Sequence, residues 1–244
     1  MKRSKMKQVH LTLQGKGGIG KSLVASLITQ YLRNKGEPVV VIDADPVSAT
    51  LSEYKALNAA RLDLLEDGRL IEGKFDAMML RIFEEDSSFV IDNGPSTFIT
   101  LSACLLENDA VNMIADRGKQ VVIHTVITGG QTLLNTASDL YNLIRAFGAN
   151  ASFVVWLNPY WGEIEKDGKS FTDFKVYKEN KDRIAGYVSL PGYQPQTYGS
   201  NVSDMLENFM TFDEADQSSD LGVVAKRRLL NVKKMIYSQM ETVI

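Results

Sequence analysis

The chain has 244 residues, of which 44% are apolar and 23% are charged, and its net charge is −3 at pH 7. These values predict a single domain with a sizeable core, and they exclude a global attraction to nucleic acid or anionic membranes, although a local patch could still bind either. Cys104 is the one cysteine, so neither a disulfide framework nor a cysteine metal cluster can form within the chain, which is typical of a reducing cytoplasm. No run of about 18 apolar residues predicts a membrane span.

The chain begins with a basic segment, residues 1–7 (MKRSKMK), that lacks the apolar stretch of a secretory signal. We expect a flexible lead-in there, with Met6 as an alternative start. No repeat, low-complexity tract or linker interrupts the rest, so residues 8–244 are expected to form a single domain.

The first predicted elements surround a phosphate-binding loop pattern, G-x-x-x-x-G-K-[ST], at residues 15–22. Apolar and polar residues alternate over residues 9–14, which predicts a strand before the loop. Apolar residues then recur at three- and four-residue steps from Val24 to Tyr31, which predicts a helix that ends near Gly36. This context favours phosphate binding over a glycine-rich turn that binds nothing.

The composition of the loop explains how it would hold a nucleotide. Glycines let backbone N–H groups approach phosphate oxygens, and the positive end of the following helix dipole points at the same place. Lys21, which we expect to be exposed at the mouth of the site, supplies a charge for the β- and γ-phosphates, and the Ser22 hydroxyl is placed to bind Mg²⁺. The predicted nucleotide-binding residues of the loop are Gly15, Lys16, Gly17, Gly18, Ile19, Gly20, Lys21 and Ser22.

A pair of aspartates follows the second predicted strand, the apolar run of residues 38–43. Asp43 and Asp45 would lie beside the phosphates, one able to join the Mg²⁺ shell and one free to orient water, which is most of what phosphoryl transfer requires. We assign Asp43 to the metal and Asp45 to the water. The alternative for Asp45 is a cap of the turn before Pro46.

A second acidic motif ends the next predicted strand, residues 88–92. Asp92 is a predicted Mg²⁺ ligand acting through water, and Gly94 could supply a backbone N–H that senses the γ-phosphate. The alternative for Asp92 is simple capping of the strand end. Ser22, Asp43 and Asp92 therefore make up the predicted metal site.

The rest of the chain alternates between predicted helices and strands, which indicates an α/β fold with a mainly parallel sheet and helices on both faces. In such sheets ligands bind at the carboxyl ends of the strands, where the loop glycines and these aspartates fall. Helices are expected at residues 75–85, at residues 98–114 (largely buried), after Gly130 with Leu133, Ala137, Leu140, Tyr141 and Ile144 on one stripe, and from Val223 onward; strands are expected at residues 120–127, 152–157 and 184–190.

Two further residues follow late strands. Asn158 could read adenine with its amide, or be a turn residue before Pro159, and Pro191 falls where a loop could pack on the base. His10 and His124 lie within predicted strands and are interpreted as hydrogen-bonded sheet histidines. The aromatic residues Trp156, Tyr160 and Trp161 are expected to cluster near the nucleotide, as core, dimer surface or base-stacking groups.

The segment KGG-x-GK[ST] resembles the deviant phosphate loop of the MinD/ParA class of ATPases. The resemblance implies that Lys16 crosses a homodimer interface to the partner's nucleotide, that ATP and Mg²⁺ are the cofactors, and that Asp45 positions the attacking water. Lys16, Lys21 and Asp45 are thus the expected catalytic residues. The segment Val47-Ser48-Ala49-Thr50 differs from the usual continuation of that family.

Longer segments, among them DADPVSATLSEYKALN, VVIHTVITGGQTLLNT and FVVWLNPYWG, resemble TraL-type ATPases of plasmid conjugal transfer. That resemblance implies a slow, partner-stimulated ATPase in the bacterial cytoplasm, with a protein partner in the transfer machinery. Alternatives are a plasmid partition ATPase that binds DNA non-specifically, a small-molecule kinase or ligase of related fold, and a nucleotide-binding scaffold without turnover.

The last predicted helix carries a stripe of Leu229, Val232, Ile236, Met240 and Val243 with basic flanks. In MinD-type relatives such a helix binds anionic lipid. We favour a helix that closes one face of the sheet, since no other segment remains to do so, with the stem of Lys233 lying along the stripe.

Overall fold

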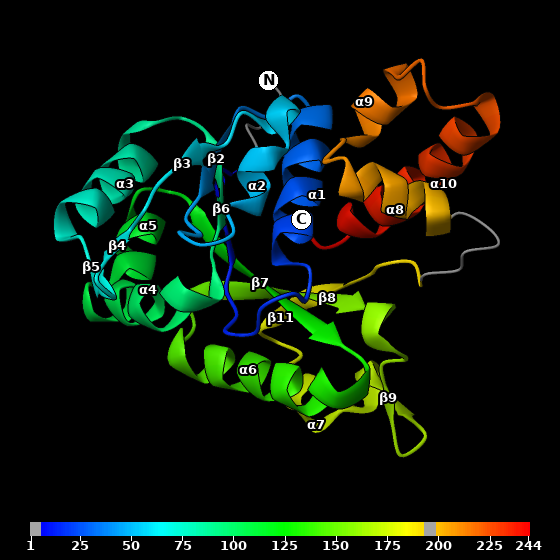
Figure 1. Ribbon diagram of the computed structural model, residues 1–244. Coiled ribbons are helices and arrows are strands. Elements are labelled where there is room, and N and C mark those ends of the chain that lie inside the picture. Colours follow the sequence, from blue (N-terminus) through cyan, green and yellow to red (C-terminus); the bar gives the residue numbers. More distant parts are fainter. Residues whose placement is uncertain (1–5, 193–198) are drawn as a thin grey trace, which may run out of the picture.

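A seven-stranded sheet of parallel strands forms the centre of the molecule, with the order β11-β8-β7-β1-β6-β2-β3 (Figure 1). The computed structural model describes residues 6–192 and 199–244, so most of the predicted lead-in, residues 1–5, lies outside the described residues. The strands are β1 (Gln8–Thr12), β2 (Val39–Asp43), β3 (Ala60–Arg61), β6 (Ser88–Asp92), β7 (Gln120–Thr128), β8 (Ala151–Asn158) and β11 (Ile184–Ser189). The predicted α/β fold is confirmed.

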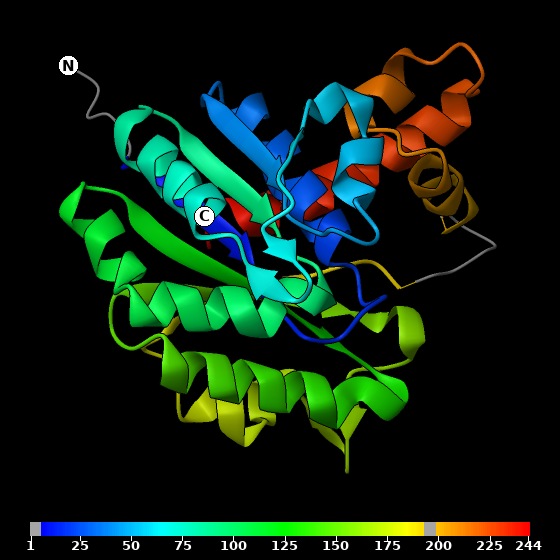
Figure 2. The same cartoon turned by 60° about the vertical axis from the view of Figure 1, so that its left-hand side comes forward.

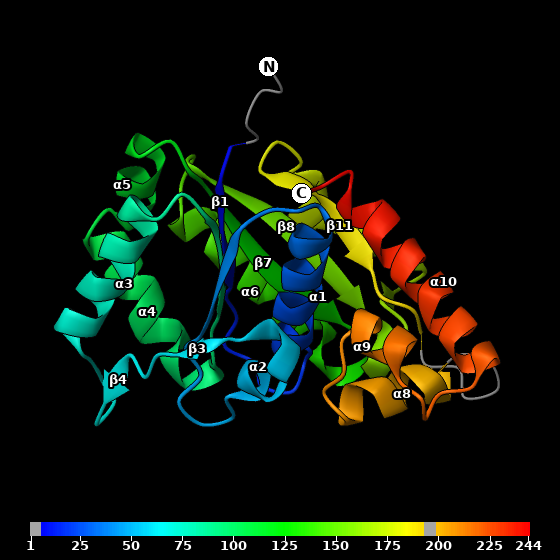
Figure 3. The same ribbon diagram turned by 90° about the horizontal axis from the view of Figure 1, so that it is seen from above.

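Helices cover both faces of this sheet, as Figures 1 and 3 show. One face packs against α1 (Lys21–Asn34), α2 (Thr50–Glu53), α8 (Ser200–Glu207), α9 (Phe212–Gln217) and α10 (Val223–Met240). The other packs against α3 (Glu72–Glu84), α4 (Pro95–Glu107), α5 (Ala110–Asp116), α6 (Leu133–Ala146) and α7 (Lys175–Lys178). Two apolar cores result, one on each side of the sheet.

Small elements that the sequence did not predict connect the larger ones. Two hairpins, β4 (Leu65–Glu66) with β5 (Arg69–Leu70) and β9 (Glu165–Lys166) with β10 (Lys169–Ser170), lie outside the main sheet. Short 3₁₀ turns are η1 (Lys55–Leu57), η2 (Gly130–Thr132), η3 (Pro159–Trp161) and η4 (Phe171–Asp173).

The helix predicted over residues 98–114 is wrong in one respect, because two helices occupy it. Asp109 takes a left-handed conformation (φ 53°), which an aspartate tolerates and a continuous helix does not. The Asn108 amide donates to the Cys104 carbonyl and closes α4 there. Figure 2 shows α4 and α5 as separate helices on the side of the sheet that carries α6. The expected burial is also partial, since Ile99 is 77% exposed.

No single helix among the described residues is long and apolar enough to cross a membrane. Only α4 and α5 together, bent by 58°, pass such a test on length and composition.

The polar side of β1 is buried as completely as its apolar side, because β1 is central and covered on both faces. His10 and His124 are hydrogen-bonded to each other at 2.9 Å (Nδ1 to Nε2), and the Trp156 indole donates to His124 Nδ1 at 3.0 Å. Burial lowers the pKa of His124 well below its usual value, and His10 lowers it further. This hydrogen-bonded chain connects β1, β7 and β8, and it confirms both residues as sheet histidines.

Candidate nucleotide and metal site

The phosphate loop connects the end of β1 to the first turn of α1. Gly18 and Gly20 have φ angles of 71° and 101°, a region that side chains with a β-carbon rarely adopt. The first turn of α1 has no side-chain cap and no acidic residue. Its free N–H groups and its dipole therefore point into the loop, which is the arrangement that binds a phosphate.

Lys21 reaches back over its own loop, and its ammonium donates to the Lys16 carbonyl at 2.8 Å. The side chain is 7% exposed, so the expectation that Lys21 is exposed at the mouth of the site is wrong. Burial lowers the pKa of Lys21, whereas the charges of Asp92, Asp45 and Asp139 raise it. The Lys21 ammonium lies near three carboxylates and could move from the Lys16 carbonyl to the oxygens of a bound phosphate.

Asp92 lies at the end of β6, and its Oδ1 accepts a hydrogen bond of 2.6 Å from the Thr12 hydroxyl. Burial raises the pKa of Asp92 to about 6, although the Ser22 and Thr12 hydroxyls lower it. Its other oxygen, Oδ2, is buried without a hydrogen-bond partner among the described residues. A buried acceptor beside Ser22 fits a water bound to Mg²⁺.

Asp43 has less capacity left for a metal. Its Oδ1 accepts from the Asp45 backbone N–H at 3.2 Å, and its Oδ2 accepts from the Ser52 N–H and hydroxyl at 2.8 and 2.9 Å. These bonds attach the start of α2 to the end of β2.

Asp45 has the capping role that the sequence analysis gave as its alternative. Its Oδ1 accepts from the backbone N–H groups of Val47 and Ser48 at 2.9 and 3.2 Å, so it does cap the turn. Neither of these bonds uses Oδ2. The carboxylate also lies against Gly94, where an added β-carbon would stand 2.4 Å from Asp45 Cγ.

A cavity of about 370 Å³ opens over these groups. It is lined by Gly17, Gly18, Gly20, Lys21, Ser22, Leu23, Asp45, Ser48, Thr50, Tyr54, Pro95, Leu206 and Phe209. Most of the loop lines it, and Asp45 joins from the β2 side. Lys16 is exposed, and its side chain forms no ion pair with any residue of the described ranges.

A second cavity of about 120 Å³ lies between α1, α8 and α10, and both Asn158 and Pro191 line it. Its walls are mostly apolar, as a base requires. The Asn158 amide donates to the Ile19 carbonyl at 2.9 Å, and its Oδ1 accepts from the Tyr160 N–H at 3.2 Å. The turn role of Asn158 is therefore present, and the amide also touches the phosphate loop.

The three aromatic residues do not form one cluster. Trp156 is fully buried in the core, whereas Tyr160 and Trp161 are 62% and 55% exposed and meet edge to face at 5.1 Å. The Trp161 indole donates to the Gly18 carbonyl at 3.3 Å. Trp161 thus contacts the phosphate loop rather than the core.

Sequence reasoning missed two groups that face this site. Thr12 could have been found, because it is a hydroxyl on the polar side of the strand that enters the loop. Asp139, on α6, had no local signal. Burial raises the pKa of Asp139, and Gln14 and Lys21 lower it. The carboxyl of Asp139 therefore lies close to the phosphate loop.

The residues present fit magnesium bound together with a nucleotide. No group of three or more His, Cys, Asp or Glu that could hold a metal occurs within residues 6–192 and 199–244. Mg²⁺ is commonly held by few protein ligands plus substrate phosphates and waters. Ser22 and the Oδ2 of Asp92, which has no hydrogen-bond partner among the described residues, would supply such a partial site.

Comparison with known proteins agrees with this geometry. The family model described as the CobQ/CobB/MinD/ParA nucleotide binding domain matches residues 11–242. Two Escherichia coli proteins named TraL are 42% and 43% identical to the chain over 236 residues, which cover 97% of this chain and 98% of each relative. Protein MobD of Acidithiobacillus ferrooxidans is 25% identical over 210 residues, 81% of each chain.

Among solved structures, the MinD cell division protein of Aquifex aeolicus matches with a TM-score of 0.51 and 14% identity, over 95% of this chain and 97% of that one. At this identity the likeness concerns the fold alone.

Proposed function

Because the chain belongs to the CobQ/CobB/MinD/ParA family of nucleotide-binding domains, we propose that it is a Mg²⁺- and ATP-dependent ATPase switch. It dimerises when it binds ATP and then hydrolyses the ATP slowly. The main support is that Lys21, Ser22 and Asp45 line one cavity at the carboxyl ends of the strands, with the charge of Asp92 acting on Lys21.

Each residue has a defined task in this proposal. The N–H groups of residues 15–22 bind the β- and γ-phosphates, and Lys21 leaves the Lys16 carbonyl to neutralise their charge. Asp45 orients the attacking water with Oδ2 while Oδ1 continues to cap the turn. Lys16, exposed and without an ion pair among the described residues, reaches the nucleotide of a second copy.

Magnesium would be held by Ser22 and, through water, by Asp92. Asp43 would lie outside these groups and would not bind the metal directly. It would supply charge neutralisation at the β- and γ-phosphates. The adenine would enter the apolar cavity bordered by Asn158 and Pro191.

We further propose that this switch serves plasmid conjugal transfer in the bacterial cytoplasm, through a protein partner of the transfer machinery. The identity to the two TraL proteins over nearly the whole chain supports this role above partition. A kinase or ligase of small molecules is a weaker candidate, because the cavity over the loop has no charged residue beyond Lys21 and Asp45 to select a metabolite.

The proposal is tested by phosphate release from ATP with and without Mg²⁺, for the wild-type chain and for Lys21→Met. The wild type should bind ATP and release phosphate only with Mg²⁺, and Lys21→Met should lose ATP binding while it unfolds at the same temperature or higher. The last expectation follows because methionine removes a charge that burial disfavours. Phosphate release stimulated by DNA would indicate partition, and phosphate transfer to a metabolite would indicate a kinase. Unchanged ATP affinity in Lys21→Met would refute the site.

A further inference from the structure

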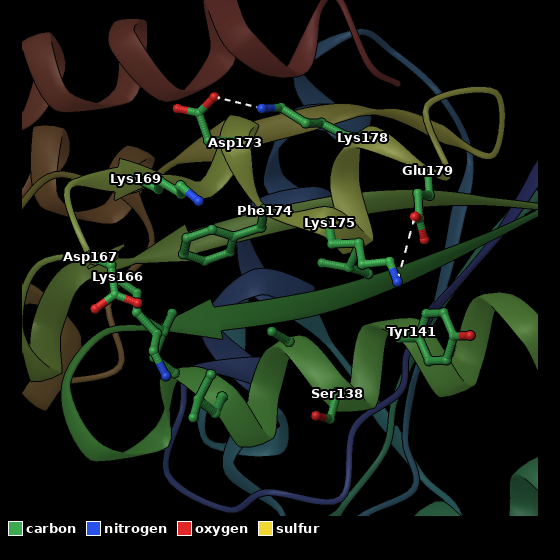
Figure 4. A pocket seen from close by; sticks show the side chains of 14 residues that line it. Ser138, Tyr141, Lys166, Asp167, Lys169, Asp173, Phe174, Lys175, Lys178 and Glu179 are labelled. Carbon is green, nitrogen blue, oxygen red and sulfur yellow. Dashed lines mark hydrogen bonds and ion pairs between the residues drawn. The ribbon is translucent and has the colours of Figure 1, made fainter.

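A groove of about 680 Å³ lies away from the nucleotide site, between α6, the β9–β10 hairpin and the segment formed by η4 and α7. We call it the α6 groove (Figure 4). It is lined by Leu133, Leu134, Ala137, Ser138, Tyr141, Lys166, Asp167, Lys169, Asp173, Phe174, Lys175, Val176, Lys178 and Glu179. None of these residues has a task in the proposed ATPase.

The floor of the α6 groove is apolar. Leu134 and Tyr141, two turns apart on α6, are 56% and 39% exposed. Phe174 lines the same groove from the segment formed by η4 and α7, and Figure 4 shows it with Tyr141. The sequence predicts Tyr141 on the buried stripe of α6. The structure instead buries Leu133, Leu140 and Ile144 and turns Tyr141 into the groove. Large apolar side chains exposed together along one groove are typical of a surface that another molecule covers.

The rim of the α6 groove is basic and incompletely paired. Lys178 bonds Asp173 at 2.9 Å and Lys175 meets Glu179 at 3.7 Å, so these four charges cancel. Lys166 and Lys169 stand directly opposite each other in the β9–β10 hairpin. Neither forms an ion pair with any residue that the structure describes.

Two like charges opposite each other in a hairpin destabilise it, and a carboxylate between them removes that cost. Asp167, in the turn between them with φ 53°, is the one carboxylate in this turn, and it forms no ion pair of 4 Å or less with either lysine among the described residues. The lining residues carry four lysines and three carboxylates, an excess of one positive charge, whereas the whole chain has a net charge of −3.

We propose that the α6 groove binds an acidic polypeptide segment of a protein partner. Apolar side chains of that segment would cover Leu134, Tyr141 and Phe174, and its carboxylates would lie at Lys166 and Lys169. A small molecule fits less well, since small-molecule sites carry a few enclosed polar groups that fix orientation. All charged residues of this groove are exposed at its rim, which is the anatomy of a protein interface.

The groove is adjacent to two elements that touch the phosphate loop. Ser138 on α6 lines the groove, and its neighbour Asp139 lies beside Lys21 and Gln14. The β9–β10 hairpin follows η3, whose Trp161 contacts Gly18. A partner in the groove would therefore contact elements that border the nucleotide site. The binding of that partner does not depend on ATP turnover.

A random peptide library displayed on phage tests this proposal. Peptides are selected on the wild-type chain and counter-selected on Lys166→Glu/Lys169→Glu. The control, Arg227→Glu/Lys234→Glu, makes the same change in net charge on exposed positions of α10. Thermal unfolding confirms that all three proteins are folded.

The retained peptides should combine acidic residues with leucine or aromatic anchors. Their dissociation constants should rise about tenfold in the hairpin variant, where attraction becomes repulsion, and change little in the control. Three outcomes would overturn the proposal: no acidic enrichment, equal binding to the hairpin variant and the wild type, or equal weakening in the control. If sedimentation shows that the hairpin variant alone loses self-association, a second copy of this chain occupies the groove and the partner proposal is wrong.

Discussion

Asp45 packs directly on the Cα of Gly94, so closely that a β-carbon at position 94 would stand 2.4 Å from Asp45 Cγ and 2.4 Å from its Oδ1. Gly94 has φ −75° and ψ 161°, which any residue adopts. The glycine is therefore required by the carboxylate beside it and not by the backbone. The contact between Asp45 and Gly94 therefore fixes the distance between the loop after β2 and the loop after β6, beside the phosphate cavity.

Gly94→Ala should displace Asp45 and slow ATP hydrolysis by more than tenfold, while the protein stays folded and loses roughly 1–3 kcal/mol of stability from overpacking. The comparison is a double-mutant cycle with Asp45→Ala, measured by phosphate release. Because the clash disappears with the carboxylate, Gly94→Ala should cost almost nothing more in the Asp45→Ala background. Additive effects would show that Gly94 acts independently of Asp45.

Asp45→Asn separates the two roles of this side chain. An amide oxygen can still accept from the Val47 and Ser48 N–H groups, so the turn and the stability should be kept. The charge is lost, and hydrolysis should fall by roughly 10²–10⁴-fold with ATP binding unchanged. A variant that hydrolyses ATP at the wild-type rate would leave Asp45 with the capping role alone.

Lys16→Ala should retain ATP binding and lose ATP-dependent dimerisation together with turnover. The side chain is exposed and no ion pair with a described residue holds it to its own chain, so its removal costs the monomer little. Light scattering with and without ATP measures the dimer, and calorimetry measures the affinity for ATP. Normal dimerisation in this variant would reduce Lys16 to a solvated neighbour of the site.

The main elements of the fold could be predicted because their signals are local. Residues 88–92 are an apolar run that ends in acid, and β6 has these bounds. Helices α7 to α9 were missed because they are short and pack on longer helices that are distant in the sequence, α6 for α7 and α10 for α8 and α9. The break at Asp109 was missed because a single left-handed aspartate leaves no periodic signal.

The candidate site was predictable as far as the phosphate loop and the acids that end β2 and β6. What remained hidden depends on contacts between distant segments. Lys21 is buried, and the charges that act on it come from Asp92, Asp45 and Asp139, which lie on three other parts of the chain. The burial of Lys21 could therefore not be predicted from the residues adjacent to it in the sequence.

Asp92→Asn should stabilise the nucleotide-free protein at neutral pH. Burial raises the pKa of Asp92 to about 6, so the folded state favours the protonated form. That contribution is complete below about pH 4, the ordinary pKa of an aspartate, and is lost as the pH rises through about 6. Asparagine is neutral throughout and can still accept from Thr12.

Urea unfolding in EDTA measures this effect at several pH values. The stability of Asp92→Asn relative to the wild type should rise between about pH 4 and pH 6 and level off near 2–3 kcal/mol above that. The same variant should lose Mg²⁺-dependent turnover. A difference in stability that does not change with pH would show that Asp92 is ionised in the folded protein at all these values.

Helix α10 should be a structural helix of the core. The predicted stripe is confirmed as far as Met240, since Leu229, Val232, Ile236 and Met240 are buried against α1, α8 and the sheet. Val243, the last residue of the predicted stripe, follows the end of α10 and is half-buried. Lys233 lies along it with its ammonium on Asp213 at 2.5 Å and over the Tyr237 ring, so its stem is packed and its charge is paired. These contacts leave no continuous apolar face for lipid.

A matched pair of substitutions tests the role of α10 in the full chain. Ile236→Ala should cost roughly 2–5 kcal/mol, as for other buried large-to-small changes, whereas Met235→Ala, which removes a side chain that is 39% exposed, should cost less than about 1 kcal/mol. Deleting residues 232–244 should precipitate the protein, because one face of the sheet would lose its cover. Binding to anionic vesicles with ATP is measured in parallel. If the truncated chain stays folded with normal ATP turnover and loses only vesicle binding, α10 is a membrane helix and the packing seen here is not its working state.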